Sequence, residues 1–322
     1  MILKYTVEAE SSGKTIKYIL REKLMFSQNL IRKLKRQNGI FCNKKPVFVN
    51  AIVKENDIVE ANINFEEKSE GVIPEDIPID IIYEDEVLIA LNKPAGIIVH
   101  PTRNHLNGTL GNALSYHFHK KGISSKIRPV MRLDRDTSGI IIFAKNSFAQ
   151  DFMTKQMWDN LFYREYIGIV HGLVDKPNGT IDLPIARKSC STIERCILPS
   201  GYPSITHYKV IEHLKNATFL RFILETGRTH QIRVHCQALG HPIYGDTLYN
   251  NAPTILENQA IFPQNQSTIT SKDSTAKDSV LINRQALHSS KVVFIHPINK
   301  KPLELAAPMP YDIENLMEIL RK

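Results

Sequence analysis

The chain has few cysteines and no long apolar segment, and both shortages exclude classes of protein. Its four cysteines, Cys42, Cys190, Cys196 and Cys236, share no close spacing, and no histidine lies at a metal-ligand interval from a cysteine pair. We therefore expect neither a disulfide framework nor a zinc site. The longest apolar runs are far too short to cross a bilayer, and no signal-peptide pattern opens the sequence, so we expect a cytoplasmic protein without membrane segments.

What the chain does have is an excess of positive charge. Lysine and arginine number 41 against 33 aspartate and glutamate residues, which gives a formal net charge of +8. That balance favours a polyanionic partner. Hydrophobic residues make up 42% of the 322 positions, an ordinary proportion for a soluble globular protein, and the length suits one large domain with a smaller one.

Residues 1–64 are predicted to form a small basic α+β module. Apolar residues at helical spacing indicate one helix over residues 14–24, and Ser27 is a suitable N-cap for a second helix that ends before Gly39. Short strands are expected around residues 40–41 and 47–50, and a last segment at residues 57–63 closes the module.

Both helices of this module carry charge of almost one sign. Ordinary solvated helix faces mix signs, so a one-sided pair of helices is a candidate for contact with RNA phosphates. The residues that we expect to make these contacts are Lys14, Lys17, Arg21, Arg32, Lys33, Lys35 and Arg36.

The chain after this module divides at segments of unusual composition. Residues 65–78 are acidic and contain two prolines and a glycine, which is typical of a linker, so we expect the second domain to span residues 79–322. Within that domain, residues 250–283 are polar and are expected to form a mobile insertion.

The chemistry is predicted to lie at residues 131–139, Met-Arg-Leu-Asp-Arg-Asp-Thr-Ser-Gly, which precede an apolar strand over residues 140–144. A charged loop that leads into a buried strand holds a carboxylate on a rigid support. Arg132 or Arg135 would lie near Asp134 and keep it ionised. From composition alone, a solvated turn with weak charge pairs is an alternative interpretation.

The string Arg-Leu-Asp-Arg-Asp-Thr-Ser-Gly resembles the catalytic motif of the RluA-type (ribosomal large-subunit) RNA pseudouridine synthases, which isomerise uridine in RNA. Residues 92–101, Asn-Lys-Pro-Ala-Gly-Ile-Ile-Val-His-Pro, and residues 225–246 resemble two further signatures of the same family. The resemblance implies that Asp134 is the essential catalytic residue. It has one departure, because Met131 stands where the family usually has histidine.

The same resemblance implies that Tyr166 packs against the target base, and an aromatic face with a polar tip suits that role. Arg233 is our first choice for the cation that pairs with Asp134 through a bidentate contact, and Arg228 is the second choice. Arg132 is expected to fill the gap that the flipped uridine leaves in its stack. The residues that we place at the substrate are Arg132, Arg228, His230 and Gln231.

The family implies an α+β fold with a mixed, mainly antiparallel central sheet. The N-terminal module resembles the small RNA-binding module first described in a small-subunit ribosomal protein. Pseudouridine formation only rejoins uracil to its sugar through another ring atom, so no cofactor and no metal is expected. His230 and His235 are predicted to lie on a strand with side chains on opposite faces, which argues against a shared zinc ion.

The expected function is pseudouridine formation in RNA by a monomer, with large-subunit ribosomal RNA as the expected target and transfer RNA as the alternative. A catalytically silent RNA-binding protein in ribosome assembly is a second interpretation. A third is a glycoside hydrolase that uses Asp134 and Asp136. Such an enzyme needs its two carboxyl groups at least about 5 Å apart, and it gives no reason for the basic module.

Overall fold

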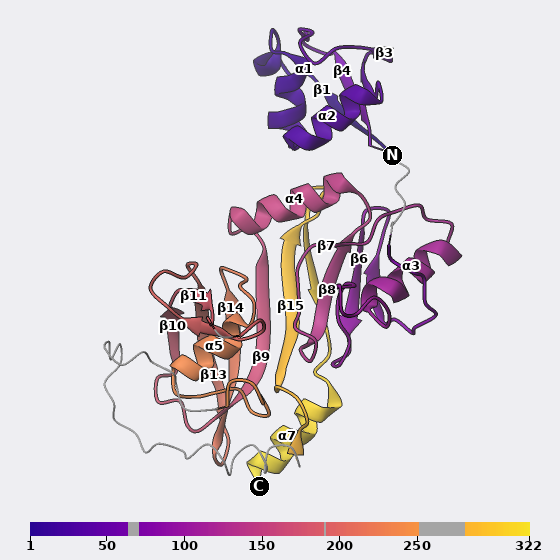
Figure 1. Cartoon of the computed structure of the whole chain (residues 1–322). Helices are drawn as coiled ribbons and strands as arrows, with labels where there is room; N and C mark the ends of the chain where they lie inside the picture. The colour runs from indigo at the N-terminus through magenta and orange to yellow at the C-terminus, as the bar shows by residue number, and fades with distance from the viewer. Residues whose placement is uncertain (64–70, 190, 251–280) are drawn as a thin grey trace.

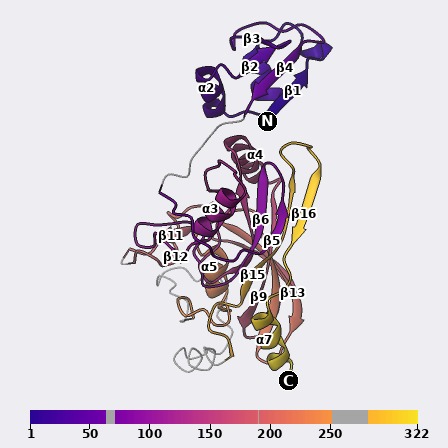
Figure 2. The same ribbon diagram turned by 90° about the vertical axis from the view of Figure 1, so that its right-hand side faces the viewer.

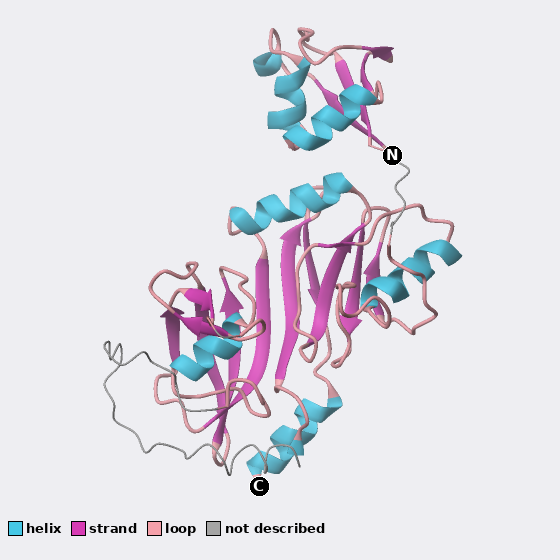
Figure 3. Ribbon diagram, viewed as in Figure 1, coloured by secondary structure: helices cyan, strands magenta, loops and turns pink. Residues whose placement is uncertain are grey.

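The structure, a computed structural model of the chain, describes residues 1–63, 71–189, 191–250 and 281–322. The chain forms a small N-terminal module and a larger body built around one sheet (Figure 1). Strands fill the centre of the larger body and helices lie at its surfaces (Figure 3). The fold class is α+β, as predicted. Among the described residues, no helix is both long and apolar enough to cross a membrane.

The N-terminal module packs helical segments against a four-stranded sheet. Its elements are β1 (Ile2–Thr6), a 3-10 turn at Ala9–Ser11, α1 (Ile16–Tyr18), a π-helical turn at Ile19–Lys23, α2 (Gln28–Arg36), β2 (Ile40–Cys42), β3 (Lys45–Pro46) and β4 (Ile58–Asn62). The strand order is β1-β4-β2-β3. Ser27 caps α2, because its Oγ accepts a hydrogen bond from the Leu30 N–H at 3.2 Å. The two predicted helices and this N-cap are confirmed.

The strand predicted at residues 47–50 is wrong. The sheet ends at β3, and the carbonyls of Val49 and Ala51 accept hydrogen bonds from the Lys17 and Ile16 N–H groups, both at 2.8 Å. The first N–H groups of a helix have no partner within the helix, so this segment supplies their acceptors. Val47 and Val49 pack against the core of the module without extending a sheet, and Phe48 is exposed.

The module contacts helix α4 (Ser147–Trp158) of the larger body. The Phe26 and Phe148 rings meet edge to face with centroids 5.3 Å apart, and the Ser27 hydroxyl donates a hydrogen bond to the Asp151 carboxylate. Phe148 is buried in the same apolar cluster as the core of the module. The two parts of the chain therefore share a hydrophobic contact.

A ten-stranded sheet forms the centre of the larger body. Its strands are β5 (Ile81–Glu84), β6 (Leu88–Lys93), β7 (Arg128–Pro129), β8 (Ser138–Ala144), β9 (Tyr163–His171), β10 (Asn178–Asp182), β13 (Ile205–His213), β14 (Ala217–Leu224), β15 (Leu287–Ile295) and β16 (Pro302–Ala306). The order is β10-β13-β14-β9-β15-β8-β6-β5, with β16 beside β15 and β7 beside β8. Among these described strands every pair is antiparallel except β8 and β15, so the sheet is mixed and mainly antiparallel, as predicted.

Helices α3 (Leu110–Lys120) and α5 (Gln231–Ala238) lie over the same face of the sheet, on its two halves (Figures 1 and 2). Helix α4 crosses one end of the strands, and α7 (Tyr311–Arg321) lies at the other end (Figure 1). A separate pair, β11 (Ile185–Arg187) and β12 (Arg195–Ile197), lies near α5. Strand β8 is buried along its whole length, which explains its unbroken apolar run.

The predicted linker and insertion lie largely outside the described residues. Of residues 65–78, the structure describes 71–78, and this part is held on the larger body. The Ile73 carbonyl accepts a hydrogen bond from Asn112 Nδ2 at 2.8 Å, and the Glu75 N–H donates to the Asn112 carbonyl at 3.2 Å. The larger body therefore begins before residue 79. The predicted insertion at 250–283 falls mostly on residues 251–280, which are outside the described ranges.

Candidate active site

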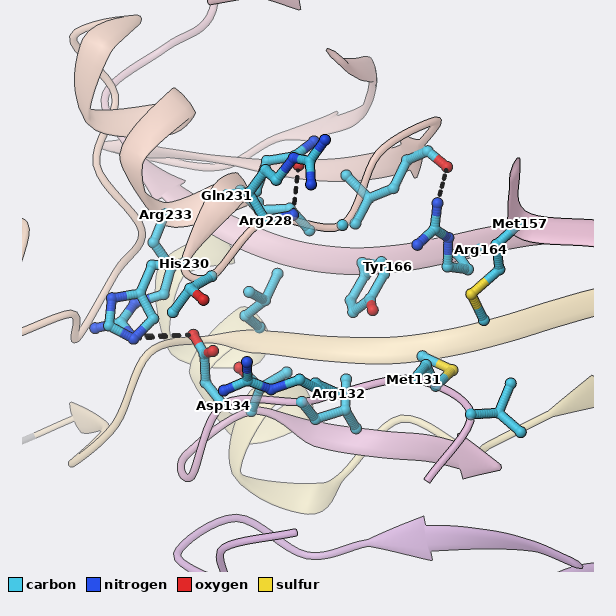
Figure 4. Close-up of a pocket in the computed structure, with 18 residues that line it drawn as sticks. Met131, Arg132, Asp134, Met157, Arg164, Tyr166, Arg228, His230, Gln231 and Arg233 are labelled. Carbon is cyan, nitrogen blue, oxygen red and sulfur yellow. Dashed lines mark hydrogen bonds and ion pairs between the residues drawn. The ribbon is translucent and has the colours of Figure 1, made fainter. Parts of the chain in front are cut away.

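A pocket lies beside α5 at the middle of the sheet (Figure 4). Three segments line most of it: residues 130–134 ahead of β8, Arg164 and Tyr166 on β9, and residues 227–233 between β14 and the first turn of α5. These segments are far apart in the sequence, and they meet because β8, β15, β9 and β14 are neighbours in the sheet. The predicted catalytic loop and the third predicted motif therefore form one site.

Asp134 and Arg233 meet at one end of this pocket (Figure 4). Arg233 Nη1 donates a hydrogen bond to Asp134 Oδ2 at 3.0 Å. The predicted bidentate geometry is wrong, because Nε and Nη2 of the same guanidinium donate to Asp246, at 2.6 and 2.9 Å. Asp246 is fully buried, and its Oδ1 also accepts hydrogen bonds from the N–H groups of Leu248 and Tyr249. The two hydrogen bonds to Asp246 therefore fix the Arg233 guanidinium and leave its Nη1 to contact Asp134.

The charge of Arg233 is secured by these carboxylates. Burial alone would lower the pKa of Arg233, but the hydrogen bonds and attraction from Asp246, together with Asp134, outweigh burial and raise that pKa above its usual value. An arginine held by two carboxylates keeps one side-chain conformation. The site thus contains a fixed positive charge in contact with the proposed reacting carboxylate.

His230 also lies beside Asp134, close to Arg233 (Figure 4). Its Nε2 is 3.9 Å from Asp134 Oδ2, and its Nδ1 is 2.8 Å from the Tyr249 hydroxyl. The His230 backbone is left-handed, with φ 59° and ψ 20°, a conformation that costs energy in a residue other than glycine. Burial lowers the pKa of His230, against the opposing effect of Asp134. A neutral ring is therefore favoured here, and Arg233 supplies the positive charge that Asp134 contacts.

The strand predicted to carry His230 and His235 is wrong, because residues Gln231–Ala238 form helix α5. Residues 231–236 are all buried, and a segment buried on every side has no apolar period that separates a helix from a strand. His235 hydrogen-bonds with Thr206 Oγ1 and the Leu183 carbonyl, at 2.9 and 3.0 Å. Within the described ranges, no three acidic, cysteine or histidine side chains converge as metal ligands would.

Tyr166 lies on β9 and presents its ring to the pocket (Figure 4). Burial raises the pKa of its hydroxyl, which therefore stays protonated. Arg164 precedes it on the same face of β9, and its Nη2 donates to the carbonyls of Leu224 and Glu225 at 3.2 and 2.8 Å. Arg164 was not among the predicted site residues. These contacts join β9 to the end of β14, where the loop to Arg228 begins.

Met131 and Arg132 line the pocket from the β8 side (Figure 4). Met131 is buried, so an apolar thioether occupies the position that the family usually gives to histidine. Arg132 is an exposed loop residue that also reaches the pocket, as expected for a side chain that meets the substrate.

Gln231 is fully used within the protein. Its Oε1 accepts hydrogen bonds from Thr226 Oγ1 and the Arg228 N–H, both at 2.9 Å, and its Nε2 donates to the Ile205 carbonyl and Thr206 Oγ1, both at 3.0 Å. The side chain is buried. Gln231 therefore fixes the loop that carries Arg228. We expected Gln231 at the substrate, and these contacts give it an indirect role there, through Arg228.

Lys93 connects the second family motif to the predicted catalytic loop by hydrogen bonds to backbone carbonyls. Its fully buried ammonium donates hydrogen bonds to the carbonyls of Pro94 and Ile97, both at 2.9 Å, and of Arg135 at 2.7 Å. Burial lowers the pKa of Lys93 to about 7. The second motif thus acts on the Asp134 loop through backbone carbonyls, a role that the sequence analysis did not identify.

The loop enters β8 through a close backbone contact. Gly139 has φ 108°, and a Cβ atom there would lie 2.2 Å from the Ser289 carbonyl oxygen on β15. Only glycine permits this approach, which occurs where β8 and β15 run parallel. The Thr137 N–H also donates to the Asp134 carbonyl at 3.2 Å. The turn between Asp134 and β8 is therefore fixed by this hydrogen bond at its start and by the approach of Gly139 to Ser289 at its end.

The predicted pairing of Asp134 with Arg132 or Arg135 is wrong, because the ion pairs of Asp134 within the described residues are with Arg233 and, at 3.9 Å, His230. Arg135 Nε donates to the Gly96 carbonyl at 3.1 Å and lies 3.9 Å from the Asp136 carboxylate. Successive side chains of a turning loop leave in different directions, so adjacency in sequence did not produce an ion pair. Asp136 also lies outside the pocket lining, which removes the paired carboxylates that a glycoside hydrolase would need.

The basic residues predicted to meet RNA lie on the helical segments of the module, except Lys14, which precedes α1. All are exposed except Lys33, which is partly buried. Burial lowers the pKa of Lys33, and Arg128 and Lys126 of the larger body act in the same direction. The basic face of α2 therefore continues toward cations of the larger body.

The site residues that the sequence analysis missed carry few signals of their roles. Asp246 ends the third motif and Lys93 is the second residue of the second motif, but nothing in the sequence indicates that they contact Arg233 and Arg135. Arg164 places a charged side chain in a buried strand, and a buried charge indicates that its guanidinium has specific partners. Tyr249, whose ring lies 5.0 Å from the Arg233 guanidinium, follows the third motif without any distinguishing pattern.

The pocket brings together Asp134, Tyr166 and Arg233, the three residues that the family resemblance assigned to the isomerisation of uridine in RNA. A family model described as RNA pseudouridylate synthase matches residues 87–238, which include Asp134, Tyr166 and Arg233. The chain belongs to the RNA pseudouridine synthase family and is an isomerase.

Relatives and a solved structure agree with this assignment. The chain is 35% identical to the uncharacterized RNA pseudouridine synthase YhcT of Bacillus subtilis over 316 residues, and this alignment covers 98% of this chain and 96% of the relative. It is 34% identical over 335 residues to the ribosomal large subunit pseudouridine synthase D of Haemophilus ducreyi, covering 100% and 96%. The structure of human RNA pseudouridylate synthase domain containing 1 aligns with a TM-score of 0.54 and 25% identity, over 74% of this chain and 86% of that one. The predicted family, fold and enzyme class are confirmed.

Proposed function

We propose that the chain isomerises uridine in large-subunit ribosomal RNA, with Asp134 as the reacting carboxylate. The observation that carries this proposal is the placement of Asp134 in a pocket, 3.0 Å from an arginine that Asp246 holds in place. A carboxylate fixed in this way already has its reactive orientation before the substrate binds and excludes water.

The reaction breaks the bond between the anomeric carbon and N1 of uracil and forms a bond from that carbon to C5. The proton on C5 leaves, and N1 gains one, so nothing is oxidised and no group is added. Asp134 can act as nucleophile at the anomeric carbon or as base at the neighbouring sugar carbon. Either role needs the carboxylate beside the sugar, and the hydrogen bond from Arg233 Nη1 fixes its orientation.

The uracil must leave its stack to reach Asp134, and the pocket contains the groups for this step. Tyr166 offers a ring face to the base, and Arg132 lies on the opposite wall beside Met131 (Figure 4). We assign Arg132 to the space that the flipped uridine vacates. Arg228 and His230 bind beside the reacting nucleotide, and Gln231 positions the loop that carries Arg228.

The target RNA follows from the relatives and the module. Synthases from Haemophilus ducreyi and Escherichia coli that match most of this chain are named for the ribosomal large subunit. The exposed basic residues of the module would meet phosphates of a long structured RNA. A transfer RNA target remains the alternative, and the complete set of Asp134, Tyr166 and Arg233 disfavours a silent RNA-binding protein.

The test is to map pseudouridine in unmodified RNA after exposure to the purified chain. Transcripts of large-subunit ribosomal RNA and of transfer RNAs should be incubated with wild-type protein and with Asp134→Asn. We expect wild-type protein to form pseudouridine at a few positions of the ribosomal transcript, and Asp134→Asn to form none. Modification of transfer RNA alone would overturn the target, and modification by Asp134→Asn would overturn the mechanism. Deletion of the gene in its host should remove the same ribosomal pseudouridines.

A further inference from the structure

Tyr202 is a large aromatic residue that the fold leaves in solvent next to the pocket. Its side chain is 70% exposed, although its backbone is firmly held. Tyr202 and Ile185 exchange two backbone hydrogen bonds, at 2.9 and 3.0 Å, and the Ser204 hydroxyl donates to the Tyr202 carbonyl at 2.9 Å. The preceding Gly201 lies so close to Ile185 that a Cβ atom would come within 2.6 Å of its carbonyl carbon. A rigid backbone therefore presents an uncovered ring.

Arg228 connects this ring to the pocket. Its guanidinium carbon lies 5.4 Å from the centre of the Tyr202 ring, and its Nε donates to the Pro203 carbonyl at 3.3 Å. The Arg228 N–H is held by Gln231, and Arg228 lines the pocket that contains Asp134. The ring and the guanidinium thus form one platform at the rim.

The charge of Arg228 is not matched by the described part of the chain. Among the residues that the structure describes, no carboxylate lies within ion-pair distance of Arg228, and its side chain is exposed. Arg233, five residues later, shows the contrast, because two carboxylates hold it. A stacked arginine without a carboxylate is suited to a phosphate, and an exposed ring face beside it is suited to a base.

We propose that Tyr202 and Arg228 bind the nucleotide next to the target uridine, the ring by stacking on its base and the guanidinium by contact with its phosphate. This inference rests on the proposed reaction at Asp134, since it assumes that the target uridine enters that pocket. The pocket receives one base, so the adjoining nucleotide must lie on the rim, where this platform stands. A surface cation–π contact without a ligand would explain the ring and the arginine but would not affect RNA.

The test measures RNA binding and not turnover. A fluorescein-labelled RNA of five uridines is compared with the same RNA in which every base except the central one is absent. By the usual effect of removing a stacking aromatic, Tyr202→Ala should bind the intact probe about 5- to 150-fold more weakly. Tyr202→Phe should bind it within about twofold of wild type, because phenylalanine keeps the face. On the probe without flanking bases, Tyr202→Ala and wild type should bind equally.

Tyr311→Ala provides the matched control, because Tyr311 is 79% exposed and lies at the start of α7. It should bind both probes as wild type does. Arg228→Gln should make the slope of log affinity against log salt shallower by about 0.7, the value for one phosphate contact with single-stranded RNA. Wild-type binding of the intact probe by Tyr202→Ala would overturn the stacking role, and so would equal losses on both probes. An unchanged salt slope for Arg228→Gln would overturn the phosphate contact.

The same titrations separate this inference from the proposed reaction. Asp134→Asn should bind the intact probe as wild type does, since its change removes chemistry and not the platform. If no RNA proves to be modified but Tyr202→Ala still weakens the intact probe alone, the proposed target or mechanism has failed and the platform stands. If modification is found and Tyr202→Ala binds normally, the platform has failed and the reaction stands.

Discussion

Asp246, whose side chain is fully buried, holds Arg233 by two hydrogen bonds, of 2.6 and 2.9 Å. Asp246 lies outside the pocket lining, and it holds Arg233 so that the remaining nitrogen, Nη1, meets Asp134. We therefore infer that Asp246 acts on the proposed reaction through Arg233, as a positioning residue. The hydrogen bonds that it accepts from the Leu248 and Tyr249 N–H groups fix the carboxylate in turn.

Asp246→Asn should reduce both stability and turnover. Removal of one partner from a buried ion pair typically costs roughly 3 to 5 kcal/mol in the free energy of unfolding. The loosened Arg233 would no longer orient Asp134, so kcat should fall at least about tenfold while RNA affinity changes by less than about threefold, a difference of under 1 kcal/mol. Urea unfolding, together with single-turnover kinetics at saturating RNA, measures both effects. A wild-type kcat in a destabilised variant would show that Asp246 serves only the fold.

Asp134→Asn should abolish turnover and leave RNA binding within a few-fold of wild type. The amide keeps the size of the side chain but can act neither as nucleophile nor as base. Asp136→Asn is the matched control, because Asp136 lies two residues away, is 44% exposed at its side chain and stays outside the pocket lining. It should retain turnover within about twofold and stability within about 0.5 kcal/mol. Equal activities for the two variants would remove Asp134 from the mechanism.

The motif residues were predictable from sequence, but their partners were not. Asp134, Tyr166 and Arg233 stand in recognisable strings, and the sheet brings these strings together as expected. The second carboxylate on Arg233 was not foreseen, because a bidentate pair with Asp134 would satisfy the same chemistry. Which two atoms meet depends on how β14 leads into α5, and that depends on packing.

Secondary structure was predictable where one face of an element meets solvent. The helix with Leu30 and Leu34 on its inner face was found, and so was its Ser27 cap. Helix α5 was mistaken for a strand because burial on all sides removes the period that identifies a helix. Residues 47–50 were mistaken for a strand because apolar, β-branched residues suit any half-buried extended segment, in or out of a sheet.

Tyr166→Phe should retain RNA binding, and Tyr166→Ala should weaken it by roughly 1 to 3 kcal/mol if the ring stacks on the target base. The aromatic face is unchanged in phenylalanine and absent in alanine. Because Tyr166 is 6% exposed, the alanine variant also leaves a cavity, so thermal melting must show that it is folded at the assay temperature. Equal affinities for both variants and wild type would assign Tyr166 to the core.

Lys93 should make stability depend on pH above neutrality. Its pKa is lowered by burial from 10.5 to about 7, so between these values the unfolded chain binds the extra proton. Stability must then rise with pH through this window, by up to about 1.4 kcal/mol per pH unit, and no such gain occurs below pH 7, where both states are protonated. Urea unfolding at pH 6, 7, 8 and 9 should show the gain in wild type.

Lys93→Met lacks that titrating group and provides the comparison. It should be less stable at every pH, because three carbonyls lose their donor. The difference between wild type and Lys93→Met should widen from pH 7 to pH 9. A constant difference over this range would mean that Lys93 keeps its charge in the folded protein, held by its three acceptors.

The basic helices of the module should anchor long RNA. Replacing Lys14, Lys17, Arg32, Lys35 and Arg36 together with glutamine changes only exposed side chains and preserves the contact of Phe26 with α4, which deletion of the module would destroy. Affinity for a long ribosomal transcript should fall, and the slope of log affinity against log salt should become shallower by about 0.7 to 0.9 for each phosphate that the module no longer neutralises. Turnover on a short fragment that contains the target uridine should change little, because the pocket lies wholly within the larger body.

A second set of substitutions separates a local anchor from a general effect of net charge. Lys176, Lys209 and Lys215 are exposed on or beside β10, β13 and β14, away from the module, and their replacement by glutamine also removes positive charge. The decrease in affinity per charge should be much smaller for this set. If the two sets lower affinity and salt slope equally per charge, the module is one part of a diffuse positive field. If the module variant also loses turnover on the short fragment while it remains folded, then α4 transmits the state of the module to the pocket, where its Met157 lies, and the two parts work as one unit.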